Sequence, residues 1–211
     1  MQVRERLARR AAKAGLSLSQ SKLTELEAYF ELLRKWNQRV ALTALPVERI
    51  GDEAVDRLLI EPCLASRHLP DTASIAIDVG SGGGSPAIPM KIMVPRISML
   101  MVESKARKSA FLREAVRHLG LADTHVESVR FEELLVRPEL HDLADVVTLR
   151  AVRTSPKTLT ALQSFLKPGG SLFLFTTSGS HIPPTPQLSH LASHALLSSL
   201  GSHLEILRRV A

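Results

Sequence analysis

The sequence has 211 residues and a formal net charge of +6, with 45% apolar and 23% charged residues. That length suits one main domain with a smaller appendage, and the composition excludes wholesale disorder. The excess of basic residues favours a polyanionic partner such as nucleic acid. Neither a stretch of roughly 20 apolar residues nor a signal peptide is apparent, so we expect a cytoplasmic protein with no membrane partner.

The first part of the chain predicts a helical extension. An amphipathic helix is expected over residues 20–40, with Ser17 and Gln20 as a capping box, because apolar residues recur there at helical intervals: Leu23, Leu26, Phe30, Leu33 and Val40. Beyond "LPDTAS" strands and helices alternate. We therefore expect an N-terminal helical extension over residues 1–72 and a main domain over residues 73–211.

Alternating elements dominate the main domain. Apolar runs predict strands at residues 74–80, 97–104, 124–128, 144–151 and 169–177, and helices at 85–93, 106–120 and 155–170. In the last helix Ser155 can cap the start, Pro156 suits the first position and Pro168-Gly169 ends the helix. This alternation implies a doubly wound, mostly parallel α/β sheet whose ligand lies at the carboxyl ends of the strands.

Residues 178–203 are rich in Ser, Pro and His and predict a loop followed by a weak helix. His190 and His194 have a spacing that can bind a metal on a helix, but neither a neighbouring carboxylate nor a third ligand is evident. Surface histidines are the simpler interpretation, and we expect no metal. Cys63 is the single cysteine, which excludes an internal disulfide framework and suits a buried thiol in a reducing compartment.

The segment "AIDVGSGGGSPAIP" places glycines between a predicted strand and a predicted helix, where backbone amides converge on a ligand. A plain tight turn is the alternative. The dinucleotide fingerprint requires a glycine where this chain has Ser85, which disfavours NAD. Gly80, Gly82 and Gly84, with Asp78 before them, resemble the S-adenosylmethionine loop of class I methyltransferases.

Glu103 ends the next predicted strand, where doubly wound folds place a carboxylate that binds a nucleoside ribose. The two acceptor oxygens of a carboxylate match a cis-diol. An exposed glutamate without a ligand is the alternative, but the glycine loop ahead of Glu103 favours a ribose contact.

The segments "LLRKWNQRVALTAL", "IDVGSGGGSPAIP", "VESKARKSAFLREAVRHLGL" and "LRAV" carry a more specific resemblance. From about residue 20 to 175 the chain resembles the bacterial 16S ribosomal RNA guanine-N7 methyltransferase family, also called the glucose-inhibited division protein B family. The resemblance implies a Rossmann-like class I fold, S-adenosylmethionine as cofactor and a guanine of 16S ribosomal RNA, in the small ribosomal subunit, as methyl acceptor. We expect a monomer.

The resemblance also implies site residues. The loop over Gly80, Ser81, Gly82 and Gly84 holds the methionine part, with Asp78 beside it, and Glu103 holds the ribose. The adenine is bordered by Arg130, Phe131 and Glu132. Arg150 matches a family arginine at the mouth of the pocket and is expected both as the catalytic candidate and as a cofactor contact; a surface ion pair is the alternative.

RNA contacts are expected from Lys35, Asn37, Arg107 and Arg150, with further phosphate contacts from the N-terminal arginines at positions 4, 6, 9 and 10. Trp36, the single tryptophan, is expected as a core anchor.

Several positions depart from the family pattern. A family His-x-x-Asp-Ser aligns with Arg57, Ile60 and Glu61, an Asn aligns with Ala41, and a Lys-Gly aligns with Thr176-Thr177. These changes spare the cofactor loop and fall on the RNA side. Two alternatives therefore stay open: a catalytically impaired RNA-binding relative, and a class I methyltransferase acting on a protein or small molecule.

Overall fold

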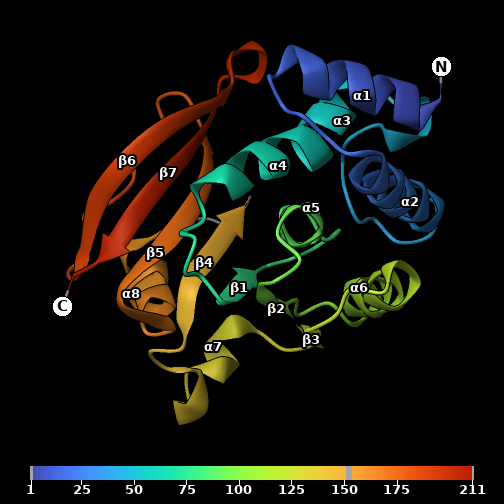
Figure 1. The fold of residues 1–211 in the computed structure, drawn as a ribbon. Helices are drawn as coiled ribbons and strands as arrows, with labels where there is room; N and C mark the ends of the chain where they lie inside the picture. The colour runs from blue at the N-terminus through green and yellow to red at the C-terminus, as the bar shows by residue number, and fades with distance from the viewer. Residues whose placement is uncertain (1, 151–153, 211) are drawn as a thin grey trace.

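A seven-stranded sheet forms the centre of the protein, for which a computed structural model describes residues 2–150 and 154–210. The strand order is β3-β2-β1-β4-β5-β7-β6 (Figure 1). The strands are β1 (Ile75–Val79), β2 (Ser98–Val102), β3 (Thr124–Glu127), β4 (Ala144–Arg150), β5 (Leu166–Thr177), β6 (Leu188–Leu197) and β7 (Ser202–Arg209). Strands β1 to β5 pair in parallel, and β7 runs antiparallel to β5 and β6. The predicted doubly wound, mostly parallel sheet is confirmed.

Helices surround this sheet. The N-terminal ones are α1 (Val3–Lys13) and α2 (Gln20–Asn37), followed by a continuous helix made of α3 (Asp52–Val55), a π-helical segment (Asp56–Ile60) and α4 (Glu61–Ala65). The others are α5 (Ala87–Met93), α6 (Ala106–Leu119), α7 (Phe131–Leu134) and α8 (Pro156–Gln163). Short 3₁₀ turns cover Val47–Arg49, Ser66–His68, Pro138–Leu140 and Ser198–Leu200. Within the described ranges, no helix is both long enough and apolar enough to cross a membrane.

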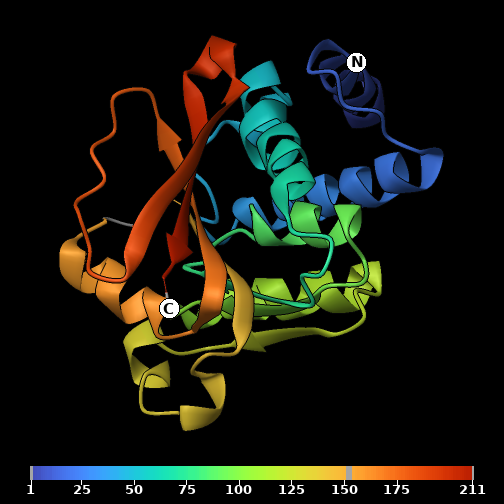
Figure 2. The ribbon, with the colours of Figure 1, turned by 60° about the vertical axis from the view of Figure 1, so that its left-hand side comes forward.

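Two cores cover the two faces of the sheet. Neighbouring strand residues alternate between them: Ala76 and Val146 join the core under the N-terminal helices, α5 and α6, whereas Ile77 and Val147 join the core under α7 and α8. The buried residues of the N-terminal helices belong to the first of these cores. Figure 2 shows the helix from Asp52 to Ala65 between these helices and the β6–β7 hairpin. The domain boundary after residue 72 stays a prediction.

Several element boundaries differ from the sequence prediction. Helix α2 is capped by Ser19, whose Oγ accepts from the Lys22 amide at 3.3 Å, so the predicted Ser17 cap was wrong. Helix α8 starts as predicted, with Ser155 as its cap, but ends at Gln163. The chain turns to strand early because Leu166 already pairs with Ala144 across the sheet. Ala151, the end of the predicted fourth strand, lies outside the described residues.

The largest difference is the β6–β7 hairpin. The predicted weak helix within residues 178–203 is wrong, because Leu188–Leu197 is a strand paired with β7. This region has few β-branched residues, so its strand form depends on pairing with β7 rather than on local propensity. The alternation of buried Leu204 and Ile206 along β7 was the available signal. His190 and His194 consequently lie on a strand, where His190 contacts Glu205 at 2.8 Å.

A buried ion pair holds α1 against the continuous helix. The Arg10 guanidinium donates to both carboxylate oxygens of Asp56, and the two side chains are only 10% and 3% exposed. Arg6 and Arg9 donate to Asp52 at 3.0 and 2.7 Å. The guanidinium groups of Arg6, Arg9 and Arg10 are thus paired with acids, although the Arg9 side chain is 55% exposed. Their contact with RNA phosphates stays a prediction.

We predict that Asp56→Ala lowers the free energy of unfolding by about 3–5 kcal/mol, because it leaves the Arg10 guanidinium buried without its partner. Urea unfolding followed by circular dichroism measures the change. The control is Glu114→Ala, which removes an exposed pair with Arg117 and should change stability little. An equal effect of both substitutions would contradict the prediction.

Candidate functional site

The glycine turn after β1 adopts backbone conformations that favour glycine. Gly80, Gly82 and Gly84 have φ values of 74°, 53° and 86°, in the left-handed region that other residues rarely adopt. The amides of Gly80 and Ser81 both donate to the Val102 carbonyl, at 2.9 and 3.1 Å. The turn is therefore tied to the end of β2, next to Glu103.

Gly82 and Gly84 are glycines for different reasons. A Cβ on Gly82 would face open space, with the Gly80 carbonyl oxygen at 3.7 Å as its nearest described neighbour. A Cβ on Gly84 would approach Ile88 Cδ1 to 2.5 Å, so helix packing excludes a side chain there. Gly82 thus leaves room for a ligand, whereas Gly84 permits α5 to pack closely.

Glu103 stands between two cavities. Its Oε2 accepts from the Gly82 amide at 2.9 Å and its Oε1 from the Lys105 amide at 2.8 Å. The first cavity, here called the loop cavity, is about 390 Å³ and lies over Gly80–Ser85. The second, here called the strand-end cavity, is about 190 Å³ and includes Arg130, Phe131 and Glu132. Gly80 and Glu103 line both, so one elongated ligand can span them.

Asp78 lies buried beneath the glycine turn. Its Oδ1 accepts from the Thr148 hydroxyl at 2.5 Å, but its Oδ2 has no hydrogen-bond partner among the described residues. Burial raises the pKa of Asp78 to about 6, because the charged form loses its hydration. An unpartnered buried carboxylate oxygen is costly unless a cation lies near it.

The N-terminal helices build the opposite wall of the loop cavity. The Tyr29 hydroxyl of α2 donates to the Gly83 carbonyl at 2.6 Å. Asn37 Oδ1 accepts from the amides of Leu42 and Thr43, both at 3.0 Å, and the segment 42–45 that follows lines the cavity. Tyr29 and this segment were not predicted as site residues, although "LTAL" lay within the motif that carried the family resemblance.

Arg150 ends β4 and borders the loop cavity. Its guanidinium donates to Glu61 Oε2 at 2.5 Å and to the Arg57 carbonyl at 2.5 Å, and it lies 5.4 Å from the centre of the Phe175 ring. Glu61 Oε1 also accepts from the Arg57 side chain at 3.4 Å. Burial raises the pKa of Glu61 and lowers that of Arg150, and the attraction between the two charges opposes both shifts.

The remaining RNA-contact candidates lie apart from this network. Lys35 is exposed beside a groove between α2 and α6, and Arg107 is exposed near the start of α6. Asn37 is half-buried, with its carboxamide oxygen engaged as described. Lys108, one residue beyond Arg107, also lines the loop cavity. Trp36 packs edge-on against Phe111, with ring centres 5.8 Å apart, in keeping with a core anchor.

These residues fit S-adenosylmethionine. A long cavity pair with a shared carboxylate accommodates a nucleoside with an extended side chain, and the free space at Gly82 admits it. Asp78 lines neither cavity and would act on a cationic ligand only through its charge, from beneath the glycine turn. Glu103 would hold the ribose, and residues 130–132 would border the adenine. Within residues 2–150 and 154–210, no group of three His, Cys, Asp or Glu side chains is arranged to hold a metal ion.

The fold and this site define a class I S-adenosylmethionine-dependent methyltransferase. Among solved structures, P. horikoshii TYW2 in complex with MeSAdo matches with a TM-score of 0.54 and 12% identity, over 72% of this chain and 62% of that chain. MtNAS in complex with MTA and tNA matches with a TM-score of 0.58 and 12% identity, over 89% and 74%. At such identities the likeness shows the fold alone.

A family model described as "rRNA small subunit methyltransferase G", GidB, matches residues 22–182, and the chain belongs to this family. Ribosomal RNA small subunit methyltransferase G of Roseiflexus castenholzii is 38% identical over 70% of this chain and 62% of that protein. The Neisseria meningitidis serogroup A protein of the same name is 36% identical over 81% of this chain and 78% of its own length. The family, its methyltransferase class and its cofactor, as predicted from the sequence, are confirmed.

We predict that Gly82→Val weakens S-adenosylmethionine binding at least tenfold, because its side chain would enter the loop cavity. Isothermal titration calorimetry measures the affinity. The matched control is Gly169→Val: Gly169 also has a positive φ, +78°, and no described atom within 4 Å of a Cβ, but it lines neither cavity. The backbone strain of roughly 1–2 kcal/mol is thus common to both variants. Equal affinities of the two variants would show that the loop is only a turn.

We also predict that cofactor affinity rises with pH between 5 and 7. Protonated Asp78 is neutral below its raised pKa of about 6, and the ionised form above it attracts a cationic sulfonium and ammonium. If only the ionised form binds, affinity increases about tenfold over that interval. Calorimetry at several pH values measures the profile. Asp78→Asn keeps an oxygen for Thr148 and should flatten it; a profile that persists in this variant would exclude Asp78 as the titrating group.

Proposed function

We propose that this protein transfers a methyl group from S-adenosylmethionine to N7 of a guanine in 16S ribosomal RNA of the small subunit, in the cytoplasm and as a monomer. The observation that carries the proposal is the position of Arg150. It borders the cofactor-sized loop cavity and, on its other side, open space at the carboxyl ends of β4 and β5, where ligands of such folds bind.

Methyl transfer to guanine N7 requires few functional groups from the protein. Guanine N7 carries a lone pair and no proton, so no general base is required. When bound, S-adenosylmethionine supplies an electrophilic methyl carbon; N7 forms a bond to it as the carbon–sulfur bond breaks, and that electron pair stays on sulfur. The chain's own contribution is to hold N7 in line with that carbon and to exclude water, a positioning effect that can lower the barrier by several kcal/mol.

Arg150 is suited to orient the acceptor. Its guanidinium is held by Glu61 and by the Arg57 carbonyl. Binding of the acceptor base therefore costs no further conformational entropy of this side chain. The departures from the family pattern at Arg57 and Glu61 form one connected network rather than isolated changes. This mutual pairing supports an active enzyme over a catalytically impaired RNA-binding relative.

Labelled methyl transfer to small subunits tests the function. We predict one methyl group per subunit, at a guanine N7, mapped by reduction and aniline cleavage of the RNA. Arg150→Ala should lower kcat at least tenfold, about 1.4 kcal/mol of barrier; Arg117→Ala, an exposed pair on α6, is the control. A methyl group on an exocyclic amine or a ribose hydroxyl, or a covalent enzyme–RNA adduct, would refute the proposal.

RNA binding is proposed to involve Lys35, Asn37 and Arg107 besides Arg150. Each lost contact between a cationic side chain and a phosphate should reduce the slope of log affinity against log salt by about 0.7–0.9. We predict this reduction for Lys35→Ala and Arg107→Ala in filter-binding titrations. Arg9→Ala is the control, because its guanidinium pairs with Asp52. If the slopes of Lys35→Ala and Arg107→Ala equal those of the wild type and of the Arg9→Ala control, these two side chains do not lie in the RNA interface.

A further inference from the structure

A cavity of about 430 Å³, here called the hairpin cavity, opens beside Arg150 at the carboxyl ends of β4 and β5 and against β7. Arg57 and Arg150 line both this cavity and the loop cavity, and they are the residues that the two have in common. A molecule in the hairpin cavity therefore has one end next to the cofactor site. No predicted cofactor contact other than Arg150 lines it.

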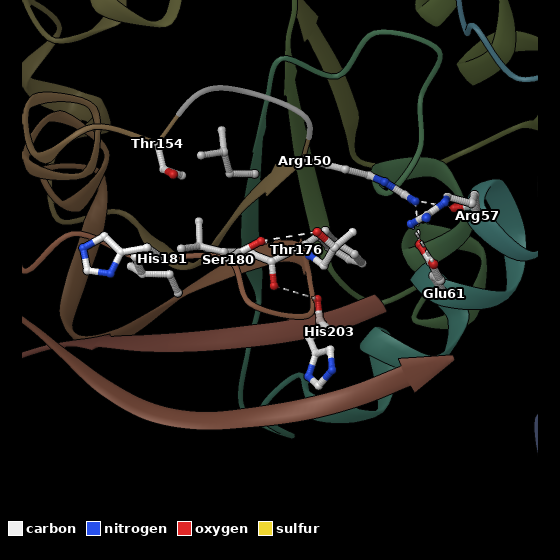
Figure 3. Close-up of a pocket in the computed structure, with 13 residues that line it drawn as sticks. Arg57, Glu61, Arg150, Thr154, Thr176, Ser180, His181 and His203 are labelled. Atoms are coloured by element: carbon white, nitrogen blue, oxygen red, sulfur yellow. Dashed lines mark hydrogen bonds and ion pairs between the residues drawn. The ribbon is translucent and has the colours of Figure 1, made fainter. Parts of the chain in front are cut away.

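The polarity of the side chains that line the hairpin cavity changes along its length. Figure 3 shows Arg57, Glu61 and Arg150 at one end and His181 at the other, with Ser180 and Thr176 between them. Apolar side chains line its sides: Leu149, Leu174, Phe175 and Ile182. The described lining also includes Thr154, Thr177 and His203. A cavity that is charged at one end, apolar along its sides and rich in hydroxyl groups beyond suits a flat heterocycle with polar edges.

A guanine base matches this order of groups. Its N7 and O6 lie on one edge, and its N2 amine lies on the opposite edge. If N7 points toward the cofactor, at the Arg150 end, O6 lies where a guanidinium donates to it. The N2 amine then points toward the hydroxyl and imidazole groups, which accept its hydrogen bonds. Adenine lacks that amine, so the far wall distinguishes the two purines.

We infer that the hairpin cavity is the acceptor site, which receives a guanine nucleoside turned out of the RNA with its N2 amine toward Thr176, Ser180 and His181. This inference rests on the proposed function, since it names the site from which the methyl group is accepted. Turning out a base costs a few kcal/mol of stacking, and contacts with the apolar walls offset that cost. Thr176, which departs from the family pattern, is then part of the recognition wall.

Ser180→Phe tests the site by filling the middle of the cavity from an exposed loop position. We expect at least a tenfold loss in kcat/KM for small subunits, with S-adenosylmethionine affinity by calorimetry unchanged within twofold. Ser189→Phe, an equal change on the exposed β6 edge outside the cavity, should retain wild-type kinetics. Wild-type kcat/KM in Ser180→Phe would overturn the inference. Subunits reconstituted with inosine at the mapped guanine lack the N2 amine and should lose tenfold; no loss would overturn the proposed orientation.

Photocrosslinking separates failure of this inference from failure of the proposed function and does not depend on the folding of Ser180→Phe. Wild-type protein is irradiated with ultraviolet light in the presence of small subunits and S-adenosylhomocysteine, and crosslinks between residues 174–182 and the RNA are mapped by mass spectrometry. A crosslink at a single guanosine, or at its immediate neighbours, supports the acceptor site even if the wild type transfers no methyl group, in which case the proposed function alone fails. Methylation without a crosslink near the methylated guanine overturns the acceptor site and leaves the function intact.

Discussion

The buried carboxylate of Glu61 is the constraint on which the arrangement of the site depends. It accepts from Arg150 at 2.5 Å and faces the Arg57 side chain at 3.4 Å, while being itself only 2% exposed. A carboxylate at that depth is unfavourable without cationic partners. Arg150 is consequently held at the boundary between two cavities, and the end of β4 is tied to the helix that Glu61 begins.

The same continuous helix also carries Asp56, which binds Arg10 of α1. Two buried acids, five residues apart, thus connect this helix to two other elements. Asp56 binds α1 through Arg10, and Glu61 binds the end of β4 through Arg150. The π-helical segment lies between these two attachments, as such segments often do near functional sites. The N-terminal helices are therefore part of the site: α2 anchors the glycine turn through Tyr29, and the chain after α2 closes the loop cavity.

The ion-pair network of Arg57, Glu61 and Arg150 relates two of the substitutions relative to the family pattern to each other. The resemblance implies a histidine and a serine where this chain has Arg57 and Glu61. The nearest partner of the Glu61 carboxylate is Arg150, at 2.5 Å, and the Arg57 guanidinium lies 3.4 Å from Glu61 and 3.9 Å from Glu53. Together they bring opposite charges into contact, and Arg150 completes the set. The i,i+4 spacing of Arg57 and Glu61 is visible in the sequence, but the contact with Arg150 is visible only in the tertiary structure.

The sequence by itself determined the features that depend on consecutive residues. The turn over Gly80–Gly84 follows from backbone conformations that only glycine adopts easily, and Glu103 follows from its place after a buried strand. The order of strands and helices from residue 74 to 163 also follows, except for the short helix α7, because hydrophobic periodicity and capping are local signals. These signals sufficed to predict the fold class and the glycine loop, whereas the family was predicted from the resemblance of particular segments to a known family.

Only the tertiary structure decided what depends on distant partners. The hairpin of β6 and β7 exists because the two strands pair with each other and with β5, and no local propensity indicated β6. Glu61 and Arg150 are 89 residues apart, so no spacing rule could pair them. The charge of the N-terminal arginines suggested a nucleic-acid surface, and only the tertiary structure shows that Arg9 and Arg10 pair with Asp52 and Asp56. Charge in a sequence specifies what a side chain attracts, but burial and packing decide which partner it finds.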